Sequence, residues 1–189
     1  MFRLAVGTLL IAALAMPRGI LARPADEGVD RARERKVQAA FLVNFVRFIQ
    51  WPDSAFDAKD AKFIIGVQGD DALAQVVARS VGGVTVQGRE IQAVRLSDDA
   101  ETESQASCHV LFLGDLSRQE REQSLQKLSG KPILLVSDAN RFARIGGMVG
   151  FVLNNGKIGF EINREVLEKA GLKASAKLLK LARLVESDE

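Results

Sequence analysis

Three short apolar runs constrain the fold of this chain more than any other feature. They cover residues 62–67 (KFIIGV), 109–114 (HVLFLG) and 132–138 (PILLVSD), and turn residues follow each of them. Apolar runs of this length without polar alternation are typical of strands that are buried on both faces. Such strands occur in parallel sheets, so the chain is expected to build one.

Helical segments follow the first two of these runs, at residues 72–80 and 118–128. Ser117 and Glu120 have the spacing of a capping box at the start of the second helix. Strands that alternate with helices predict parallel βα units. We therefore expect a single-domain, three-layer α/β fold with a mostly parallel central sheet and helices on both faces.

The last third of the sequence has a different pattern. Asn154, Asn155 and Gly156 separate two strand-like runs, which is a hairpin signal. Two helices are expected after this C-terminal β-hairpin, one over residues 164–170 and a final one over 175–185. Earlier in the chain, two short strand-like runs meet at Gly88, and the acidic residues 98–107 are expected to form a surface loop.

The segment AFLVNFVRFIQWP at residues 40–52 is interpreted as a helix that Pro52 ends. On a helix its polar residues Asn44, Arg47 and Gln50 fall on one narrow stripe, and a core-facing stripe consists of Val37, Phe41, Phe45 and Phe48. Residues 23–35 before it are expected to be a flexible lead-in that becomes helical near Glu34, and the folded domain to span residues 36–187.

The apolar side chains of this helix extend over about two-thirds of its circumference. One core-facing side does not account for all of them, and two explanations remain open. The excess either packs under the final helix or forms an interface with a partner or a second copy. The candidate residues for such an interface are Phe45, Phe48, Trp51 and Phe56.

The N-terminal residues have the pattern of a secretory signal peptide. Arg3 precedes an apolar run over residues 4–16, and small residues follow it. The run is shorter than the roughly 20 residues of a spanning helix, although an uncleaved membrane anchor is the alternative. Cleavage is expected after Ala15 or, preferably, after Ala22, which gives a signal peptide of residues 1–22 and a periplasmic location.

Charge and cysteine content narrow the possible functions. The formal charge of +2 falls to about zero when cleavage removes Arg3 and Arg18, and this argues against nucleic acid as a partner. Cys108 is the only cysteine, so the exported chain forms no internal disulfide. Its position before an apolar strand is typical of a buried and unreactive thiol.

No motif in the sequence predicts catalysis, a cofactor or a metal site. There is no GxGxxG, Walker-type or zinc-binding spacing, and the single His109 lies inside an apolar run, where a histidine is usually a satisfied core residue. Ser137 and Asp138 have no nearby base except His109 on another strand. The protein is therefore expected not to be an enzyme.

Polar residues at the ends of the three strands are the candidates for a ligand site. In open α/β sheets ligands bind beyond the carboxyl ends of the strands. The expected ligand rim therefore consists of Asp70, Asp115, Ser137 and Asp138, with Gly69 and Gly114 beside them. The alternative is that these residues only form turns and helix caps.

Several segments together resemble the YfiR-like family of periplasmic proteins. They are VQAAFLVNFVRFIQWPDSAF at residue 37, FIIGVQGDD at 63, GREI at 88, CHVLFL at 108, PILLVSDANRFARIGGMVGFV at 132 and GFEINREVLEKAGLKASAKLLKLARLV at 159. The resemblance spans nearly the whole chain after the signal peptide. Disulfides are frequent in the family, and Cys108 departs from that pattern because it has no partner.

The resemblance implies a non-enzymatic α/β protein that pairs with itself as a homodimer. It also implies a repressor that holds the periplasmic sensor domain of an inner-membrane diguanylate cyclase inactive, and so sets cyclic di-GMP signalling and biofilm formation. Partners of relatives include histidine kinases, and an outer-membrane lipoprotein can sequester the repressor. Two other functions remain open: a small-molecule sensor or cryptic enzyme at the strand ends, and a purely structural role in the envelope.

Overall fold

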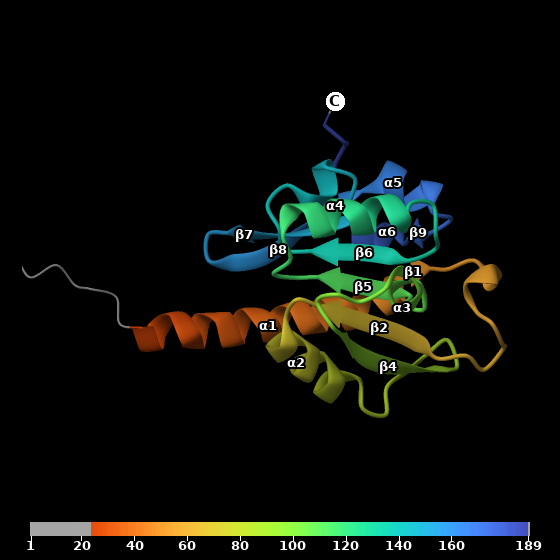
Figure 1. Ribbon diagram of the computed structural model, residues 1–189, viewed down its shortest axis with the longest axis horizontal. Coiled ribbons are helices and arrows are strands. Elements are labelled where there is room, and N and C mark those ends of the chain that lie inside the picture. Colours follow the sequence, from red (N-terminus) through yellow and green to blue (C-terminus); the bar gives the residue numbers. More distant parts are fainter. Residues whose placement is uncertain (1–23, 189) are drawn as a thin grey trace, which may run out of the picture.

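The computed structural model describes residues 24–188 and contains a central eight-stranded sheet between two layers of helices (Figure 1). The mixed α/β fold with a mostly parallel sheet is the one expected. Its elements in chain order are α1 (Pro24–Phe48), β1 (Ile49–Gln50), the 3-10 helix η1 (Asp53–Ala55), β2 (Phe63–Gln68), α2 (Asp71–Val81), β3 (Thr85–Val86), β4 (Arg89–Leu96), α3 (Thr102–Ala106), β5 (Val110–Leu113), α4 (Arg118–Lys127), β6 (Leu134–Ser137), the 3-10 helix η2 (Phe142–Arg144), β7 (Val149–Asn154), β8 (Lys157–Asn163), α5 (Arg164–Lys169), β9 (Lys173–Ala174), α6 (Ala176–Leu179) and β10 (Arg183–Val185).

The strands of the large sheet follow the order β10-β8-β7-β6-β5-β2-β4-β3. The pairs from β4 through β2, β5 and β6 to β7 are parallel, and so is the pair of β10 with β8. The hairpins β3–β4 and β7–β8 are antiparallel. Asn155 and Gly156 both have positive φ at the β7–β8 turn, as a two-residue hairpin loop with these residues requires.

Alternate side chains of the central strands fill two separate cores. In β5, Val110 and Phe112 lie in the core under α1 and α2, whereas Leu111 and Leu113 lie in the core under α4. This alternation follows from the period of two along a strand. Both faces of the strand are apolar because helices cover both, which confirms the interpretation of the three apolar runs.

The C-terminal half of α1 accounts for most of the aromatic surface that the sequence concentrates there. Phe45 is fully buried, and Phe41 is partly buried beside it. The rings of both residues contact Phe151 and Phe160 of the β7–β8 hairpin at centroid separations between 5.1 and 6.1 Å. These rings of α1 therefore pack on a hairpin that lies more than 100 residues later in the sequence.

Four sequence expectations differ from the structure. The helix expected to continue to Pro52 ends at Phe48, because Ile49 and Gln50 form strand β1, which pairs with β9. Helix α1 begins at Pro24 and not near Glu34, because Pro suits a first helical turn and residues 31–36 have high helix propensity. The segment expected as a surface loop contains the short helix α3, since its buried Gln105 hydrogen-bonds to Gln68 and Ser124.

The fourth difference is the final helix, which was expected to continue to residue 185. Helix α6 ends at Leu179, and residues Arg183–Val185 form strand β10 beside β8. Arg183 pairs there with the carboxylate of Glu161, whose side chain is only 3% exposed. A buried carboxylate needs such a partner. The strand conformation brings Arg183 to Glu161, whereas a helix over the same residues would leave Glu161 without Arg183.

Candidate functional site

A cleft lies at the carboxyl ends of β2, β5 and β6. The chain leaves β2 toward β4 on one side of the sheet and leaves β5 toward β6 on the other side. The adjacent strands β2 and β5 therefore form a topological switch point, where connections run in opposite directions and open α/β sheets bind ligands. The cleft has a volume of about 740 Å³ and includes the loops after both strands.

Two glycines bring the loops after β2 and β5 into contact. The Asp115 N–H donates to the carbonyl of Gly69 at 3.0 Å. Gly69 has a φ of +76°, and a Cβ there would lie 2.9 Å from the Asp115 nitrogen. A Cβ on Gly114 would lie 2.9 Å from the Gly69 carbonyl oxygen. Only glycine fits at either position, so the floor of the cleft consists of the backbones of two loops that are hydrogen-bonded to each other.

Helix α1 forms one wall of the cleft and is fastened to the end of β2. The Nε–H of Arg35 donates to both carboxylate oxygens of Asp70, at 3.0 and 2.8 Å. Asp70 also caps α2 by accepting a hydrogen bond from the Leu73 N–H at 2.9 Å. One carboxylate therefore holds the start of α2 and fixes α1 beside it.

A second contact joins α1 to the end of β6. The amide of Gln38, which is buried, donates to a carboxylate oxygen of Asp138 at 3.3 Å. Surrounding protein raises the pKa of the Asp138 carboxyl above its ordinary value by desolvation, and the negative charge of Asp70 nearby acts in the same direction. Gln38 and the guanidinium of Arg121 partly offset this rise.

The remaining groups of the cleft come from the loop after β5, from α4 and from the loop after β6. One Nη of Arg121 donates to the carbonyl of Leu116, which orients its side chain. The residues that line the cleft are Arg31, Glu34, Arg35, Gln38, Gly69, Asp70, Asp71, Ala72, Gly114, Asp115, Arg121, Asp138, Ala139 and Asn140. The surface of the cleft is thus dominated by charged and polar groups of both signs.

The structure brings together three of the four residues expected at a ligand rim. Asp70, Asp115 and Asp138 line the cleft, together with the two glycines. Ser137 does not, because it is fully buried and its hydroxyl donates to the carbonyl of Leu113 at a distance of 2.5 Å. It also accepts from the Ala139 N–H, so its role is to shape the turn after β6.

Sequence reasoning missed the contribution of α1. Arg31, Glu34, Arg35 and Gln38 recur at intervals of three and four residues and therefore share one helix face. This spacing was a usable signal for a polar wall. The assumption of a flexible lead-in concealed it.

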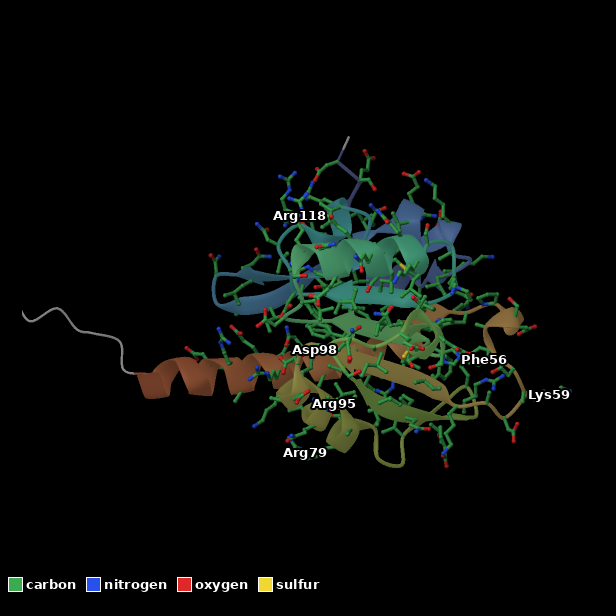
Figure 2. All side chains as sticks on the ribbon, in the orientation of Figure 1. Phe56, Lys59, Arg79, Arg95, Asp98 and Arg118 are labelled. Carbon is green, nitrogen blue, oxygen red and sulfur yellow. The ribbon has the colours of Figure 1, made fainter. Side chains whose placement is uncertain are left out.

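The opposite end of the sheet, at the amino ends of β2 and β5, is packed with rings. Phe63 contacts both Trp51 and Phe56 edge to face, at 5.3 and 5.1 Å between centroids. Phe56 stacks on His109 at 4.6 Å, and the guanidinium of Arg89 lies 3.9 Å from the Phe56 centroid. Figure 2 shows Phe56 at this end of the molecule.

His109 and Cys108 do not form a catalytic pair. The Ile64 N–H donates to Nδ1 of His109 at 3.1 Å, and the Nε2–H donates to the carbonyl of Ala55 at 3.1 Å. Both ring nitrogens are satisfied in the neutral form, and burial lowers the pKa of His109. Burial also raises the pKa of the Cys108 thiol to about 11, which disfavours the nucleophilic thiolate.

The four aromatic residues expected at an interface differ in their burial. Phe45 is fully buried within the chain, so it belongs to the core and offers no surface to a partner. Phe48, Trp51 and Phe56 are partly buried and pack against the same core. An interface role for these three remains a prediction, whereas the burial of Phe45 excludes it from a surface of this fold.

Two further properties concern residues 24–188. Among the side chains of residues 30–188, no group of three or more His, Cys, Asp or Glu is arranged to hold a metal ion. None of the helices in residues 24–188 combines the length and the apolar character needed to cross a bilayer.

Comparison with known families extends these observations beyond the single chain. Residues 35–183 match the family model described as YfiR/HmsC-like. The matched region begins in α1, includes every residue of the cleft from Arg35 onward, and ends at the start of β10. Proteins of this family are regulatory and periplasmic. The resemblance inferred from sequence segments is thus confirmed, and the chain belongs to the YfiR/HmsC-like family.

Proposed function

We propose that this protein regulates an inner-membrane diguanylate cyclase by direct contact with the periplasmic sensor domain of that enzyme. The observation that supports this role best is the family match over residues 35–183. Release or binding of the regulator then changes cyclic di-GMP output and biofilm formation. A histidine kinase with a similar sensor domain is a further candidate partner, and an outer-membrane lipoprotein is a candidate for sequestering the regulator.

The proposed mechanism requires no chemistry from the regulator itself. It needs only to bind the inactive conformation of the partner more tightly than the active one. A preference of about 3 kcal/mol shifts a balanced equilibrium to roughly 150 to one. The satisfied state of His109 and the high thiol pKa of Cys108 agree with a protein that acts by binding.

The contact surface is proposed to include Phe48, Trp51 and Phe56, which reach the surface in part. Other apolar side chains are more exposed. Leu181 is 68% exposed and lies just before the edge strand β10, and Leu184 is 53% exposed and lies within it. An unpaired strand edge can pair with another chain, so these two positions are suitable for mapping contacts with a partner.

Photocrosslinking in intact cells tests this function. A photoreactive amino acid is placed at Phe48, Leu181 or Leu184 in separate variants, and at exposed Lys59 as the matched control. We expect crosslinks from at least one of the first three positions to the sensor domain of a cyclase or kinase, identified by mass spectrometry. Crosslinks only between copies of this chain would support the expected homodimer and contradict the regulatory contact.

The cleft supports a second candidate function, the sensing of a small molecule. Its volume of about 740 Å³ lies within the range of ligand pockets, and several charged groups converge on it. A ligand would then raise the melting temperature of the protein, and Asp138→Ala would remove this rise. Absence of any shift across a broad panel of metabolites would contradict this second function and would leave the first one intact.

A further inference from the structure

The cleft at the switch point contains charged groups that the fold does not use. Arg35 contacts Asp70 through Nε alone, and its Nη atoms form no hydrogen bond with any of residues 30–188. One Nη of Arg121 donates to the carbonyl of Leu116, and the other guanidinium nitrogens of Arg121 form no hydrogen bond with residues 30–188. Guanidinium groups bind carboxylates with two parallel hydrogen bonds. The cleft therefore offers unused donors to an anionic group.

Two carboxylates on the same cleft are also available. Asp115 forms no ion pair within residues 24–188, and Asp138 accepts one side-chain hydrogen bond, from the neutral amide of Gln38. By contrast, Asp70 is paired with Arg35, and Asp71 is paired with Arg95. Asp115 and Asp138 are thus acceptors for a cationic group, and a cation beside Asp138 would relieve the cost of its desolvation.

We propose that this cleft binds a small zwitterion with a free carboxylate and a free ammonium group, that is, an amino acid or a short peptide. The carboxylate of the ligand accepts hydrogen bonds from the guanidinium of Arg121 and from the Nη atoms of Arg35. The ammonium group of the ligand donates to the carboxylates of Asp138 and Asp115. This inference rests on the second function above and names its class of ligand.

The mixture of charges disfavours other classes of small polar ligand. A phosphate dianion would approach the carboxylates of Asp115 and Asp138 as well as the arginines, and like charges repel each other. A polyamine would meet the two guanidinium groups in the same way. A ligand that carries one charge of each sign avoids both conflicts, because each of its ends faces groups of opposite charge.

Occupation of the cleft has a direct consequence for α1. Arg35 and Gln38 are at once cleft residues and the contacts that join α1 to the ends of β2 and β6. A ligand between these groups would add contacts across the same junction. We therefore expect the amide protons of α1 around these residues to exchange more slowly when the ligand is bound.

The test is affinity selection by native mass spectrometry with the full mature chain. The probes are the common amino acids, a random tripeptide library, and the same library with acetylated amino ends or amidated carboxyl ends. Inorganic phosphate, spermidine and glucose serve as ligands of other classes. We expect retention of a free-ended compound, and a Kd at least about tenfold weaker when either end is blocked, because one charged hydrogen-bonding group is lost.

Two variants and one control locate the binding. Arg121→Gln and Asp138→Asn should each weaken binding by about tenfold or more, while circular dichroism shows a folded protein. Arg118→Gln lies on the same helix α4, outside the cleft, and pairs with Glu122, so it should bind like the unchanged chain. Figure 2 shows Arg118 on the outer side of α4. Arg121→Lys distinguishes loss of charge from loss of the hydrogen bond to Leu116.

Each outcome decides a separate point. Preference for single amino acids or for tripeptides identifies the source of the zwitterion. Binding of phosphate, spermidine or glucose with the same dependence on Asp138 would overturn the ligand class and leave a sensing function in place. Failure to retain any probe at millimolar concentration would overturn the inference, and the regulatory contact with a membrane enzyme would still be tested separately by crosslinking.

Discussion

The two ends of the central sheet differ in how completely their polar and aromatic groups are used. At the amino ends of the strands, rings of Phe56, Phe63 and His109 pack together, and both nitrogens of His109 have partners. At the carboxyl ends, Asp115 and part of Arg121 face an open cleft without partners in the described chain. The amino end therefore contributes mainly to stability, with the buried Nε1 of Trp51 as a donor without a partner among the described residues. The carboxyl end retains several charged groups that are available for binding.

The largest effect should come from the aromatic end. Phe63→Ala removes a ring that is 1% exposed and contacts Trp51, Phe56 and His109. We expect the free energy of unfolding to fall by about 3–5 kcal/mol, because the cavity lies among rings that cannot all move inward. Urea denaturation measures this. A loss below about 1 kcal/mol would show that this end is not a structural core.

His109 should give a pH-dependent effect of intermediate size. Its pKa is lowered in the folded state, so the unfolded chain takes up a proton first as the pH falls. The stability that neutral His109 provides is complete above about pH 6.5 and is lost progressively below it. Melting temperatures of the unchanged chain and of His109→Phe, measured from neutral to acidic pH, should converge as the pH falls. A constant difference would contradict this assignment.

Asp70 should have a smaller effect, because its carboxylate is part of both the structure and the cleft. Asp70→Ala removes the cap of α2 and the partner of Arg35, and should cost about 1–2 kcal/mol of unfolding free energy. Arg35→Gln leaves the cap in place and should cost less than about 1 kcal/mol. Chemical denaturation of both variants separates the two contributions, and an equal loss in each would indicate that the ion pair dominates.

Asp138 should give the smallest effect on stability and the opposite pH dependence. Its pKa is raised on folding, so ionisation of its carboxyl disfavours the folded state at neutral pH. Asp138→Asn should therefore leave the melting temperature unchanged or slightly higher at pH 7. As the pH falls through the pKa of Asp138 in the folded state, the melting temperature of the unchanged chain should approach that of Asp138→Asn. A clear loss of stability in Asp138→Asn at neutral pH would make Asp138 a structural residue.

The sequence predicted the central sheet well because its signals are local. Apolar runs such as that of β5, the capping box of α4 and the Asn155-Gly156 turn depend on neighbours within a few residues. The strand-end rim followed from the same local pattern and from a general rule of α/β topology. Three of its four residues line the cleft for this reason.

The errors concern contacts between distant segments. Strand β10 depends on the pairing of Arg183 with Glu161, and α3 depends on a hydrogen bond from Gln105 to Gln68. The burial of Phe45 depends on the β7–β8 hairpin. No local pattern encodes these partners, so a core ring was taken as an interface residue. The lead-in before α1 is a different error, because the spacing of its charged residues was a local signal that was not used.

The regulatory role is tested most directly by the cyclic di-GMP content of cells that lack this protein. If the protein represses a diguanylate cyclase, deletion should raise cellular cyclic di-GMP several-fold, and re-expression of the exported chain should restore the original level. Restoration by a chain retained in the cytoplasm would contradict contact in the periplasm. An unchanged level after deletion, in cells whose cyclase is expressed, would contradict repression itself.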